Sequence, residues 1–374
     1  MSKIRIPLAK PSFDEREVEA VRRVLASGWV VQGLEVEAFE NTLAQMHQAK
    51  HCIAVSSGTA ALHICYLALG IGPGDAVFVP SFAWPSAANM AMLVGARPVF
   101  VDVLHDTYNI DPDDLRRRIQ QCIKRKWGKP RVVVPVHEFG LAVNMDVILE
   151  LAKEYNLEVI EDAACALGAT YKGRSVGTFG RMGIFSFHPR KAITTGEGGA
   201  IVTDDEQLAE KCRMWRNHGQ VFQNRVRDFQ VAGLNYRMTE IQAAIGRVQL
   251  EKFPQILKRR REIASQYIRE LGECRAISLP ANNQEHTWQT FMVVLDDNKD
   301  RDSVIDRLAK RGIGCGPGSV AAHCIKVYQK SLGYKAEDLP VSAKLDLYGL
   351  ALPVFEELSA KEQKETAEFL KGCL

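Results

Sequence analysis

The strongest constraint on the fold is a regular alternation of short apolar runs with amphipathic stretches over the first two-thirds of the chain. Candidate strands occupy residues 51–55, 76–79, 98–101, 132–136, 157–160, 183–187 and 199–202. Candidate helices lie between several of them, at residues 60–69, 86–94, 113–123 and 145–155. Strands that alternate with helices form βαβ units. The sequence therefore predicts an α/β fold built on a mainly parallel sheet.

The last third of the chain has a different pattern. Residues 239–252 predict a helix, because Ile241, Ala244 and Val248 fall on one face, and Pro254 is expected to end or kink it. Further helices are expected at 259–271, 301–311 and 359–370, and an apolar run lies at 290–295. We expect a large domain at residues 1–250, including an N-terminal arm, and a smaller α+β domain at residues 251–374.

Composition excludes several classes of protein. The formal net charge of the 374 residues is +3, which gives no strong electrostatic attraction to nucleic acid or membrane. No stretch has the length of a membrane span, and the first residues lack the apolar core of a signal peptide. The nine cysteines are scattered and form no C-x-x-C pair, so neither a metal site nor a disulfide framework is expected. A reducing cytoplasm is the simplest location.

Two basic runs require an explanation. Residues 116–118 are all arginine and are followed by a second cluster at 124–126, and residues 258–261 read Lys-Arg-Arg-Arg. Both runs have helical spacing and nearby acids, and only Trp127 flanks them as an aromatic that could stack on a base. A solvated helix face is therefore preferred over a nucleic-acid contact.

An anion-binding loop is a candidate at residues 56–62, which read Ser-Ser-Gly-Thr-Ala-Ala-Leu between a strand and a helix. Gly58 permits a tight turn, and the free amides at the start of the helix favour an anion. Thr59 could cap the helix or bind the anion. Taken alone the signal is weak, because Ser and Thr are common helix caps.

Two acids end a later candidate strand. Glu161 and Asp162 follow Val159 and Ile160, and ligands of open α/β sheets bind at the carboxyl ends of the strands. An acid at this place can bind a ring nitrogen or a metal. A cap for the following helix is an equally good interpretation of these residues alone.

A lysine lies between a strand end and a glycine-rich turn. The strand at 183–187 delivers Ser186, a turn then presents Lys191, and residues 194–199 read Thr-Thr-Gly-Glu-Gly-Gly. A lone lysine is nearly always a surface charge. A buried amine near a cation or an apolar wall, however, loses its proton more readily and becomes a nucleophile for carbonyl groups.

With these motifs in place, the chain resembles the DegT/DnrJ/EryC1/StrS family of sugar aminotransferases. The matching segments lie at residues 6–11, 27–33, 56–62, 95–102, 161–164, 185–199, 233–238 and 351–353. The resemblance implies a fold type I transferase that depends on pyridoxal phosphate. Such a fold has a mostly parallel seven-stranded sheet flanked by helices and a smaller C-terminal α+β domain. The resemblance also implies a homodimer with shared active sites.

The resemblance assigns a role to residues on three sides of the cofactor. Lys191 matches the lysine that carries pyridoxal phosphate as a Schiff base, and it is the expected catalytic residue. Asp162 matches the partner of the pyridine nitrogen, where a carboxylate keeps the ring protonated and electron-withdrawing. Ser186 matches a serine that binds the phosphate.

Four further residues match cofactor-binding positions of the family. Thr59 and Ala60 match the amides that bind the phosphate. Trp84 matches an aromatic residue that stacks on the cofactor ring, although core packing is the plain alternative for any aromatic residue. Asn235 matches an asparagine that reaches the phosphate from the neighbouring subunit, where the sequence alone indicates only a turn residue.

The chain also departs from the family pattern. Relatives usually carry Gln or His three residues after the aspartate, where this chain has Cys165, a weak hydrogen-bonding residue. Around residues 315–323 many relatives have a tyrosine and a proline before the histidine. For His323 a substrate contact and a structural role are therefore equally good expectations, and His188 fits the pattern without a definite role.

The resemblance implies a ping-pong transamination, in which Lys191 moves the proton and the amino group passes from L-glutamate to a keto sugar. The acceptor is expected to be a nucleotide-linked keto-deoxysugar, with a keto-cyclitol as the alternative. A sugar dehydratase that uses the same cofactor is a second interpretation, but relatives of that kind have histidine at the position of Lys191. A third is a regulatory protein that binds the cofactor without catalysis. A nicotinamide-binding protein is disfavoured, because no G-x-G-x-x-G follows the first strand.

Overall fold

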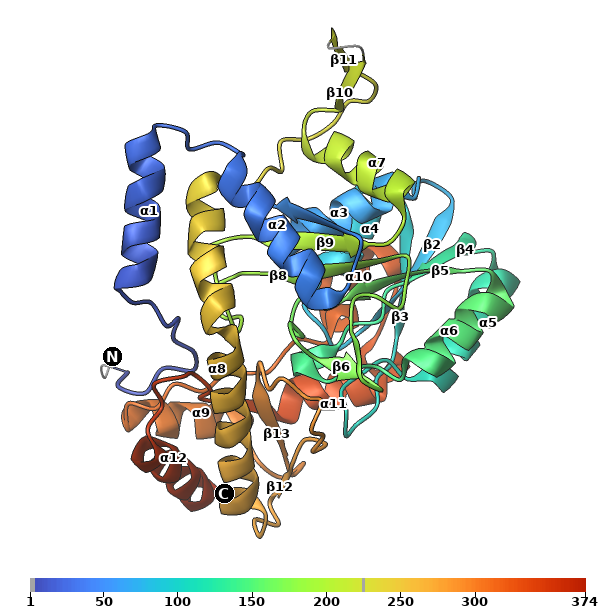
Figure 1. Ribbon diagram of the computed structural model, residues 1–374. Coiled ribbons are helices and arrows are strands. Elements are labelled where there is room, and N and C mark those ends of the chain that lie inside the picture. Colours follow the sequence, from blue (N-terminus) through green and yellow to red (C-terminus); the bar gives the residue numbers. More distant parts are fainter. Residues whose placement is uncertain (1–3, 224–225) are drawn as a thin grey trace.

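A seven-stranded sheet forms the centre of the computed structural model, which describes residues 4–223 and 226–374 (Figure 1). The strands follow the order β1-β9-β8-β5-β4-β2-β3. Their bounds are β1 (His51–Val55), β2 (Asp75–Pro80), β3 (Arg97–Val101), β4 (Lys129–Val133), β5 (Glu158–Asp162), β8 (Met182–Ser186) and β9 (Gly199–Thr203). Only β9 runs antiparallel to its two neighbours within this sheet. The predicted mostly parallel seven-stranded sheet is thus confirmed.

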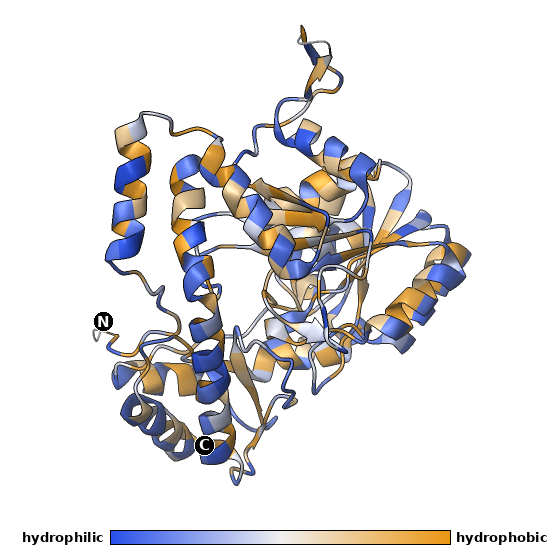
Figure 2. Ribbon diagram, viewed as in Figure 1, coloured by the Kyte–Doolittle hydropathy of each residue, from blue (hydrophilic) through white to orange (hydrophobic). Residues whose placement is uncertain are grey.

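Helices cover both faces of the sheet, because successive side chains of each strand point to opposite faces. Val77 and Val79 of β2 pack into a buried cluster with helices on one face, whereas Ala76 and Phe78 pack into a cluster with helices on the other. The first cluster includes residues of α3 (Gly58–Ala68), α4 (Ser86–Leu93) and α7 (Glu206–Arg216), and the second includes residues of α5 (Pro112–Arg125) and α6 (Met145–Tyr155). Figure 2 shows the apolar residues concentrated in these central strands.

The N-terminal arm forms two helices, α1 (Glu15–Ser27) and α2 (Leu34–His47), which pack against α8 (Glu240–Leu271). Asp14 and Glu17 form a capping box at the start of α1. Gly28 ends this helix in the left-handed conformation, with φ 73°, which glycine adopts without strain.

Helix α8 shows that Pro254 does not end a helix, which was one of the two predicted outcomes. A single helix runs from Glu240 to Leu271 and contains this proline, so the separate helix expected at 259–271 is its second half. A proline removes one backbone donor, but residues on both sides of it are buried, including Phe253 and Ile256. Packing of these flanks outweighs the lost hydrogen bond.

The C-terminal part of the chain builds a second core beside the large sheet. Its antiparallel sheet has the order β12 (Ile277–Ser278), β13 (Phe291–Leu295) and β14 (Gly349–Leu352). The end of α8, α9 (Arg301–Lys310) and α12 (Ala360–Cys373) contribute to its buried cluster, as does Ile6 from the N-terminal arm, which bridges Ile313.

Part of the C-terminal segment packs on the large core instead. Tyr328 and Tyr334 belong to the cluster beneath α3 and α4, and the hydroxyl of Tyr334 accepts a hydrogen bond from the amide of Phe100 at 3.0 Å. The proposed boundary at residue 250 also falls inside α8. The division into residues 1–250 and 251–374 therefore stays a prediction.

The remaining elements are short. They are the pair β6 (Thr170–Tyr171) and β7 (Arg174–Ser175), the hairpin β10 (Gln220–Gln223) and β11 (Val226–Phe229), helices α10 (Lys326–Leu332) and α11 (Pro340–Tyr348), and the 3-10 turns η1 (Glu138–Gly140), η2 (Ala322–Cys324) and η3 (Ala336–Asp338). The hairpin projects from the body of the molecule (Figure 1). None of the described helices is both long and apolar enough to cross a bilayer.

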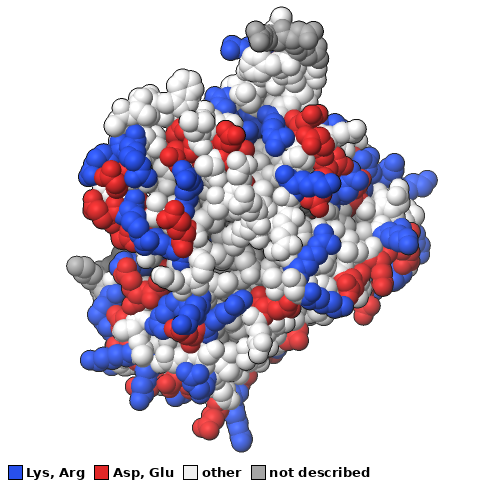
Figure 3. All heavy atoms as spheres, in the orientation of Figure 1, with Lys and Arg blue, Asp and Glu red and all other residues white. Residues whose placement is uncertain are grey.

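Several side chains of the two basic runs form ion pairs within the chain. Arg116 binds Glu154 at 2.7 Å, and Arg117 and Arg118 both bind Asp114. In the second run Arg260 is buried and pairs with Glu356, so the expectation of a wholly solvated face is wrong for this residue. On the face drawn in Figure 3, acidic and basic side chains are interspersed around an uncharged centre.

Candidate active site

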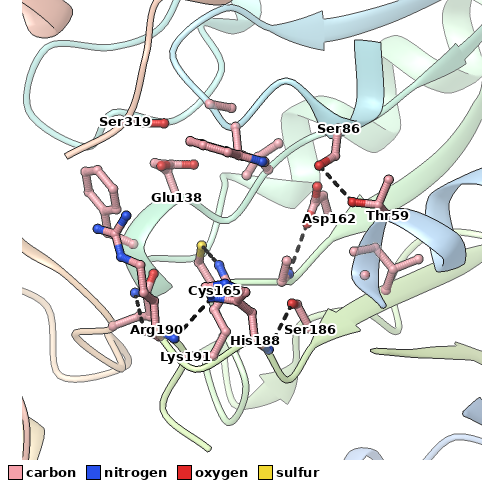
Figure 4. Close-up of a pocket in the computed structure, with 18 of the residues that line it drawn as sticks. Thr59, Ser86, Glu138, Asp162, Cys165, Ser186, His188, Arg190, Lys191 and Ser319 are labelled. Carbon is pink, nitrogen blue, oxygen red and sulfur yellow. Dashed lines mark hydrogen bonds between the residues drawn. The ribbon is translucent and has the colours of Figure 1, made fainter. Parts of the chain in front are cut away.

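A cavity of about 410 Å³ opens where β5 and β8 end and α3 begins. Five of the predicted site residues line it: Thr59, Trp84, Asp162, Ser186 and Lys191. Figure 4 shows four of these side chains converging from different elements, together with residues that the sequence did not single out. The fold thus brings together side chains that are up to 132 residues apart in the chain (191 minus 59).

The start of α3 forms one end of the cavity. Ser57 caps this helix, and its hydroxyl accepts a hydrogen bond from the amide of Ala60 at 3.0 Å. The hydroxyl of Thr59 lies 3.1 Å from that of Ser86. Because the first amides of a helix have no acceptor within it, Gly58 and Thr59 present N–H groups and the positive end of the helix dipole to an anion.

Two glycines allow the backbone to close tightly around this end. A Cβ atom on Gly58 would lie 2.9 Å from Cβ of Ser186, and one on Gly199 would lie 2.4 Å from the carbonyl carbon of Ser57. Both distances are shorter than carbon atoms tolerate without a shift of the chain. Glycine at these positions therefore brings Ser186 against the helix start.

The two acids of β5 have separate tasks. Glu161 is fully buried and accepts hydrogen bonds from the amides of Gly177, Phe179 and Gly180 and from Nε2 of His137. The ring of His137 is fixed in turn, because its Nδ1 accepts from the amide of Val143 at 3.1 Å. Glu161 therefore anchors a loop and does not reach the cavity.

Asp162 is the acid that faces the cavity. One carboxylate oxygen accepts a hydrogen bond from the amide of Ala164 at 3.0 Å. Burial raises the pKa of Asp162 above its usual value, although this hydrogen bond and the charges of Lys191 and His137 oppose the shift. A cationic ring nitrogen placed beside Asp162 would stabilise its ionised form.

Lys191 reaches the cavity from the turn after β8, where its amide donates to the carbonyl of His188 at 2.8 Å. Its Nζ donates to Sγ of Cys165 at 3.0 Å. Desolvation disfavours the ammonium, but Cys165, Asp162 and Glu138 outweigh it and raise the pKa of Lys191. Burial favours loss of the proton, as expected, but the neighbours of Lys191 are acidic groups rather than a cation or an apolar wall, so the net shift of its pKa is upward.

Glu138 is a cavity residue that sequence reasoning missed. It begins the turn η1, is 4% exposed and lies beside Ser319 (Figure 4). Burial raises the pKa of Glu138 to about 8, with a further upward contribution from Asp162 and an opposing one from Lys191. The sequence did hold a signal for Glu138, because it follows β4. Ligands of open α/β sheets bind at the carboxyl ends of the strands, and the same rule singled out Asp162 at the end of the neighbouring strand β5.

Other candidate residues have clear positions. Trp84 is 69% exposed at the edge of the cavity, so its indole is free to cover a ligand. His188 lines the cavity, and its Nδ1 accepts from the amide of Arg190. His323 is fully buried and binds Ser81 at 2.6 Å, so a structural role holds for this residue and it does not line the cavity.

Ala60 and Asn235 do not line the cavity of their own chain. The amide of Ala60 donates a hydrogen bond to the hydroxyl of the cap residue Ser57. A role for this amide in phosphate binding stays a prediction. Asn235 is exposed, and its backbone bridges that of Asn217. Its predicted contact with a neighbouring subunit also stays a prediction.

The donor set of the cavity fits pyridoxal phosphate. The amides at the start of α3, with Ser186 and Thr59, suit a phosphate group. Asp162 suits a protonated ring nitrogen, and Lys191 supplies the amine that an aldehyde requires. The part of the chain that the structure describes contains no group of three or more His, Cys, Asp or Glu side chains that could hold a metal ion.

Comparisons with known proteins agree with this fit. The pattern of the DegT/DnrJ/EryC1/StrS aminotransferase family matches residues 11–371. A DegT/DnrJ/EryC1/StrS aminotransferase from Brucella abortus is 33% identical over 96% of this chain and 95% of its own, with a TM-score of 0.88. A putative sugar aminotransferase from Streptococcus pneumoniae, solved in its PMP form, is 28% identical over 99% of both chains, with a TM-score of 0.91. An aminotransferase of Helicobacter pylori involved in the biosynthesis of pseudoaminic acid is 26% identical over 98% of both chains, with a TM-score of 0.91.

Proposed function

The chain belongs to the DegT/DnrJ/EryC1/StrS family of sugar aminotransferases and uses pyridoxal phosphate, and from this we propose that it moves an amino group from L-glutamate to a nucleotide-linked keto-deoxysugar. The observation that carries the proposal is the convergence of Lys191, Asp162 and the start of α3 on one cavity. Each supplies a different requirement of the same cofactor: an amine, a carboxylate and an anion-binding helix end.

Bound pyridoxal phosphate supplies an aldehyde that takes up the amino group and a ring that withdraws electrons from the substrate carbon. Thr59 and Ser186 would hold the phosphate, and Asp162 would keep the ring nitrogen protonated. Lys191 would hold the cofactor between turnovers through Nζ. As a free amine, Nζ would take a proton from the substrate carbon and return it elsewhere, as a general base and then a general acid.

A single cavity must then accept two substrates in turn. The donor leaves as a keto acid before the keto sugar enters, which makes the kinetics ping-pong. Trp84 borders this cavity at the solvent side, and Arg190 and His188 line it as basic groups that suit the carboxylates of L-glutamate. These features support a dicarboxylate donor followed by a larger acceptor.

We also propose that the protein acts as a homodimer with shared active sites. The N-terminal arm exposes large apolar side chains between the end of α1 and the first residue of α2, including Trp29, Val31 and Leu34, the last of them 79% exposed. Contiguous apolar residues of this kind mark a protein interface. Exposure of Asn235 leaves it available to a second subunit.

A cytoplasmic location completes the proposal. All nine cysteines are free thiols, as a reducing compartment would keep them.

The proposed reaction is tested with a panel of nucleotide-linked keto sugars and L-glutamate, read by mass for the replacement of a carbonyl oxygen by an amine. A product with at least one sugar, together with stoichiometric 2-oxoglutarate, is expected. Exchange of label between glutamate and 2-oxoglutarate without any amino sugar would contradict the acceptor class while leaving the donor in place. Bound cofactor without any exchange would favour the non-catalytic alternative.

A further inference from the structure

Glu138 is a buried acid for which the proposed chemistry has no use. Its carboxyl group lines the cavity, and it has no ion pair among the described residues. Burying an acid without a salt bridge costs stability, so its presence calls for a ligand that interacts with it.

The turn that holds Glu138 is fixed from several sides. Its amide donates to the side-chain oxygen of Asn109 at 2.9 Å. The next residue, Phe139, has φ 54°, a left-handed conformation that non-glycine residues rarely adopt. The carbonyl groups of Phe139 and Gly140 accept hydrogen bonds from the amides of Gln289 and Thr287. A strained backbone conformation that the surrounding hydrogen bonds hold in place is typical of functional sites.

Ser319 is held beside Glu138 by close packing of its own loop. A Cβ atom on the preceding residue, Gly318, would lie 2.8 Å from the ring of Phe139 and 2.2 Å from Sδ of Met292. The loop therefore lies directly on the turn η1. Ser319 is 7% exposed and lines the same cavity, so a hydroxyl group accompanies the carboxyl group.

This pair lies across the cavity from the phosphate end. In Figure 4, Thr59, Ser86 and Ser186 lie on one side of the cavity, and Glu138 and Ser319 lie on the other, above Cys165 and Lys191 in this view. A substrate joined to the cofactor next to Lys191 must extend away from the phosphate end. Glu138 and Ser319 thus border the space that is left for the substrate.

Resting on the proposed function, we propose that Glu138, assisted by Ser319, is a specificity-determining residue that hydrogen-bonds hydroxyl groups of the acceptor sugar. A protonated carboxyl group both donates and accepts hydrogen bonds, which suits neighbouring hydroxyls of a sugar. An uncharged polyol also imposes no further charge on a cavity that already holds Asp162 and Lys191.

The alternatives fit less well. A carboxylate of the donor would repel an ionised Glu138, and a cationic ligand would require it to be ionised. The charges that face Glu138 are Lys191, which favours ionisation, and Asp162, which opposes it, and burial holds its pKa at about 8. Glu138 is therefore mostly protonated at pH 7, a state that both donates to and accepts from hydroxyl groups.

The test compares two variants of the holoenzyme in separate half-reactions. Glu138→Leu removes the hydrogen-bonding group, and Glu138→Gln is the matched control that keeps hydrogen bonding without the acid. The donor half-reaction is followed by the absorbance change on adding L-glutamate. The acceptor half-reaction is followed with the keto sugar that the panel identifies, and thermal melting checks that each variant is folded.

The proposal predicts that Glu138→Leu lowers kcat/KM for the keto sugar about tenfold or more, mainly through KM, because a lost hydrogen bond of about 1.4 kcal/mol is tenfold. The donor half-reaction should change less than about twofold, and Glu138→Gln should restore most of the loss for a neutral sugar. Equal losses in both half-reactions, or no loss with the sugar, would overturn it. An equal loss in Glu138→Gln would point to a cationic ligand and overturn it as well.

Failure of the proposed function gives a different result, since the unaltered enzyme would then aminate no sugar of the panel. In that event the binding of the same nucleotide-linked sugars to the unaltered holoenzyme and to Glu138→Leu is compared by calorimetry. A binding loss of about tenfold in the variant would retain the hydroxyl-binding role. Equal affinities, or no binding to either protein, would overturn it.

Discussion

The amine nitrogen of Lys191 lies 3.0 Å from the sulfur of Cys165. The contact has opposite consequences for the two groups. Desolvation by burial is the largest influence on the thiol and raises the pKa of Cys165, although the charge of Lys191 opposes the shift. Cys165, together with Asp162 and Glu138, raises the pKa of the amine against desolvation. Before the cofactor binds, Lys191 is therefore held as an ammonium.

Cys165→Ala should move the uptake of pyridoxal phosphate to lower pH. Only the neutral amine attacks the aldehyde, and removal of the sulfur removes one of the influences that raise the pKa of Lys191. The rate of cofactor uptake by the cofactor-free protein, measured against pH, should reach its midpoint at a lower pH in this variant. Cys165→Ser, which keeps a hydrogen-bonding atom, should shift it less. An unchanged or raised midpoint in Cys165→Ala would show that the sulfur does not hold the proton on Lys191.

Removing the negative charge should have different effects at the two neighbouring acids of β5, Glu161 and Asp162: it should lower stability at the first and catalytic activity at the second. Glu161→Gln replaces an acceptor of three amide hydrogen bonds and should lower the free energy of unfolding by about 2–4 kcal/mol. Asp162→Asn relieves the desolvation that raises the pKa of this acid, so the cofactor-free protein should be as stable as before. Its donor half-reaction should nevertheless fall by about a thousandfold, because the ring nitrogen loses its anionic partner. Urea unfolding and glutamate-dependent absorbance measure the two effects, and equal behaviour of both variants would refute the division of roles.

Gly199→Ala should weaken cofactor binding and destabilise the fold. Its added Cβ would lie 2.4–2.6 Å from backbone atoms of Ser57 and Gly58, so the start of α3 must move. We expect a loss of roughly 1–3 kcal/mol in stability and a raised Kd for pyridoxal phosphate. Gly372→Ala is the control, because no atom lies within 4 Å of the added Cβ there and the residue is helical. Equal cofactor affinity in Gly199→Ala and the control would show that the close approach is not needed.

Much of the large sheet could be predicted from the sequence, because its strands are short, apolar and separated by amphipathic helices. The boundary of β4 was predicted three residues too late, at 132–136 in place of Lys129–Val133. Val134 and Val136 are buried beyond the end of the strand, whereas its first residue, Lys129, is exposed. An apolar run in the sequence indicates which residues are buried, and here the buried residues continue past the end of the strand. The strand was therefore placed too late.

The site was only partly predictable for a related physical reason. Residues that belong to a motif, such as Asp162 and Lys191, stand out in the sequence. Glu138 has no periodic pattern around it. Its burial depends on a turn that is fixed by hydrogen bonds to Asn109, Thr287 and Gln289, which are distant in the sequence. The raised pKa of Lys191 also depends on acids that lie far away in the sequence, so the sequence alone did not indicate the direction of the net shift.

Hybrid dimers test the predicted role of Asn235. If each site combines Lys191 of one subunit with Asn235 of the other, a hybrid of Lys191→Ala and Asn235→Ala chains contains one intact site. Random reassociation of equal amounts should therefore recover about a quarter of the unaltered activity, although each variant alone is inactive or strongly impaired. Activity no higher than that of the unmixed variants would contradict shared sites, provided that sedimentation shows dimers that exchange subunits.

The central claim is that Lys191 carries the cofactor, and chemical mapping tests it most directly. Reduction of the holoenzyme with borohydride followed by peptide mass analysis should place the pyridoxyl phosphate on Lys191. The Lys191→Ala variant should show neither the modification nor the absorbance of lysine-linked cofactor. A pyridoxyl group on another lysine, or an unchanged spectrum in Lys191→Ala, would contradict the account.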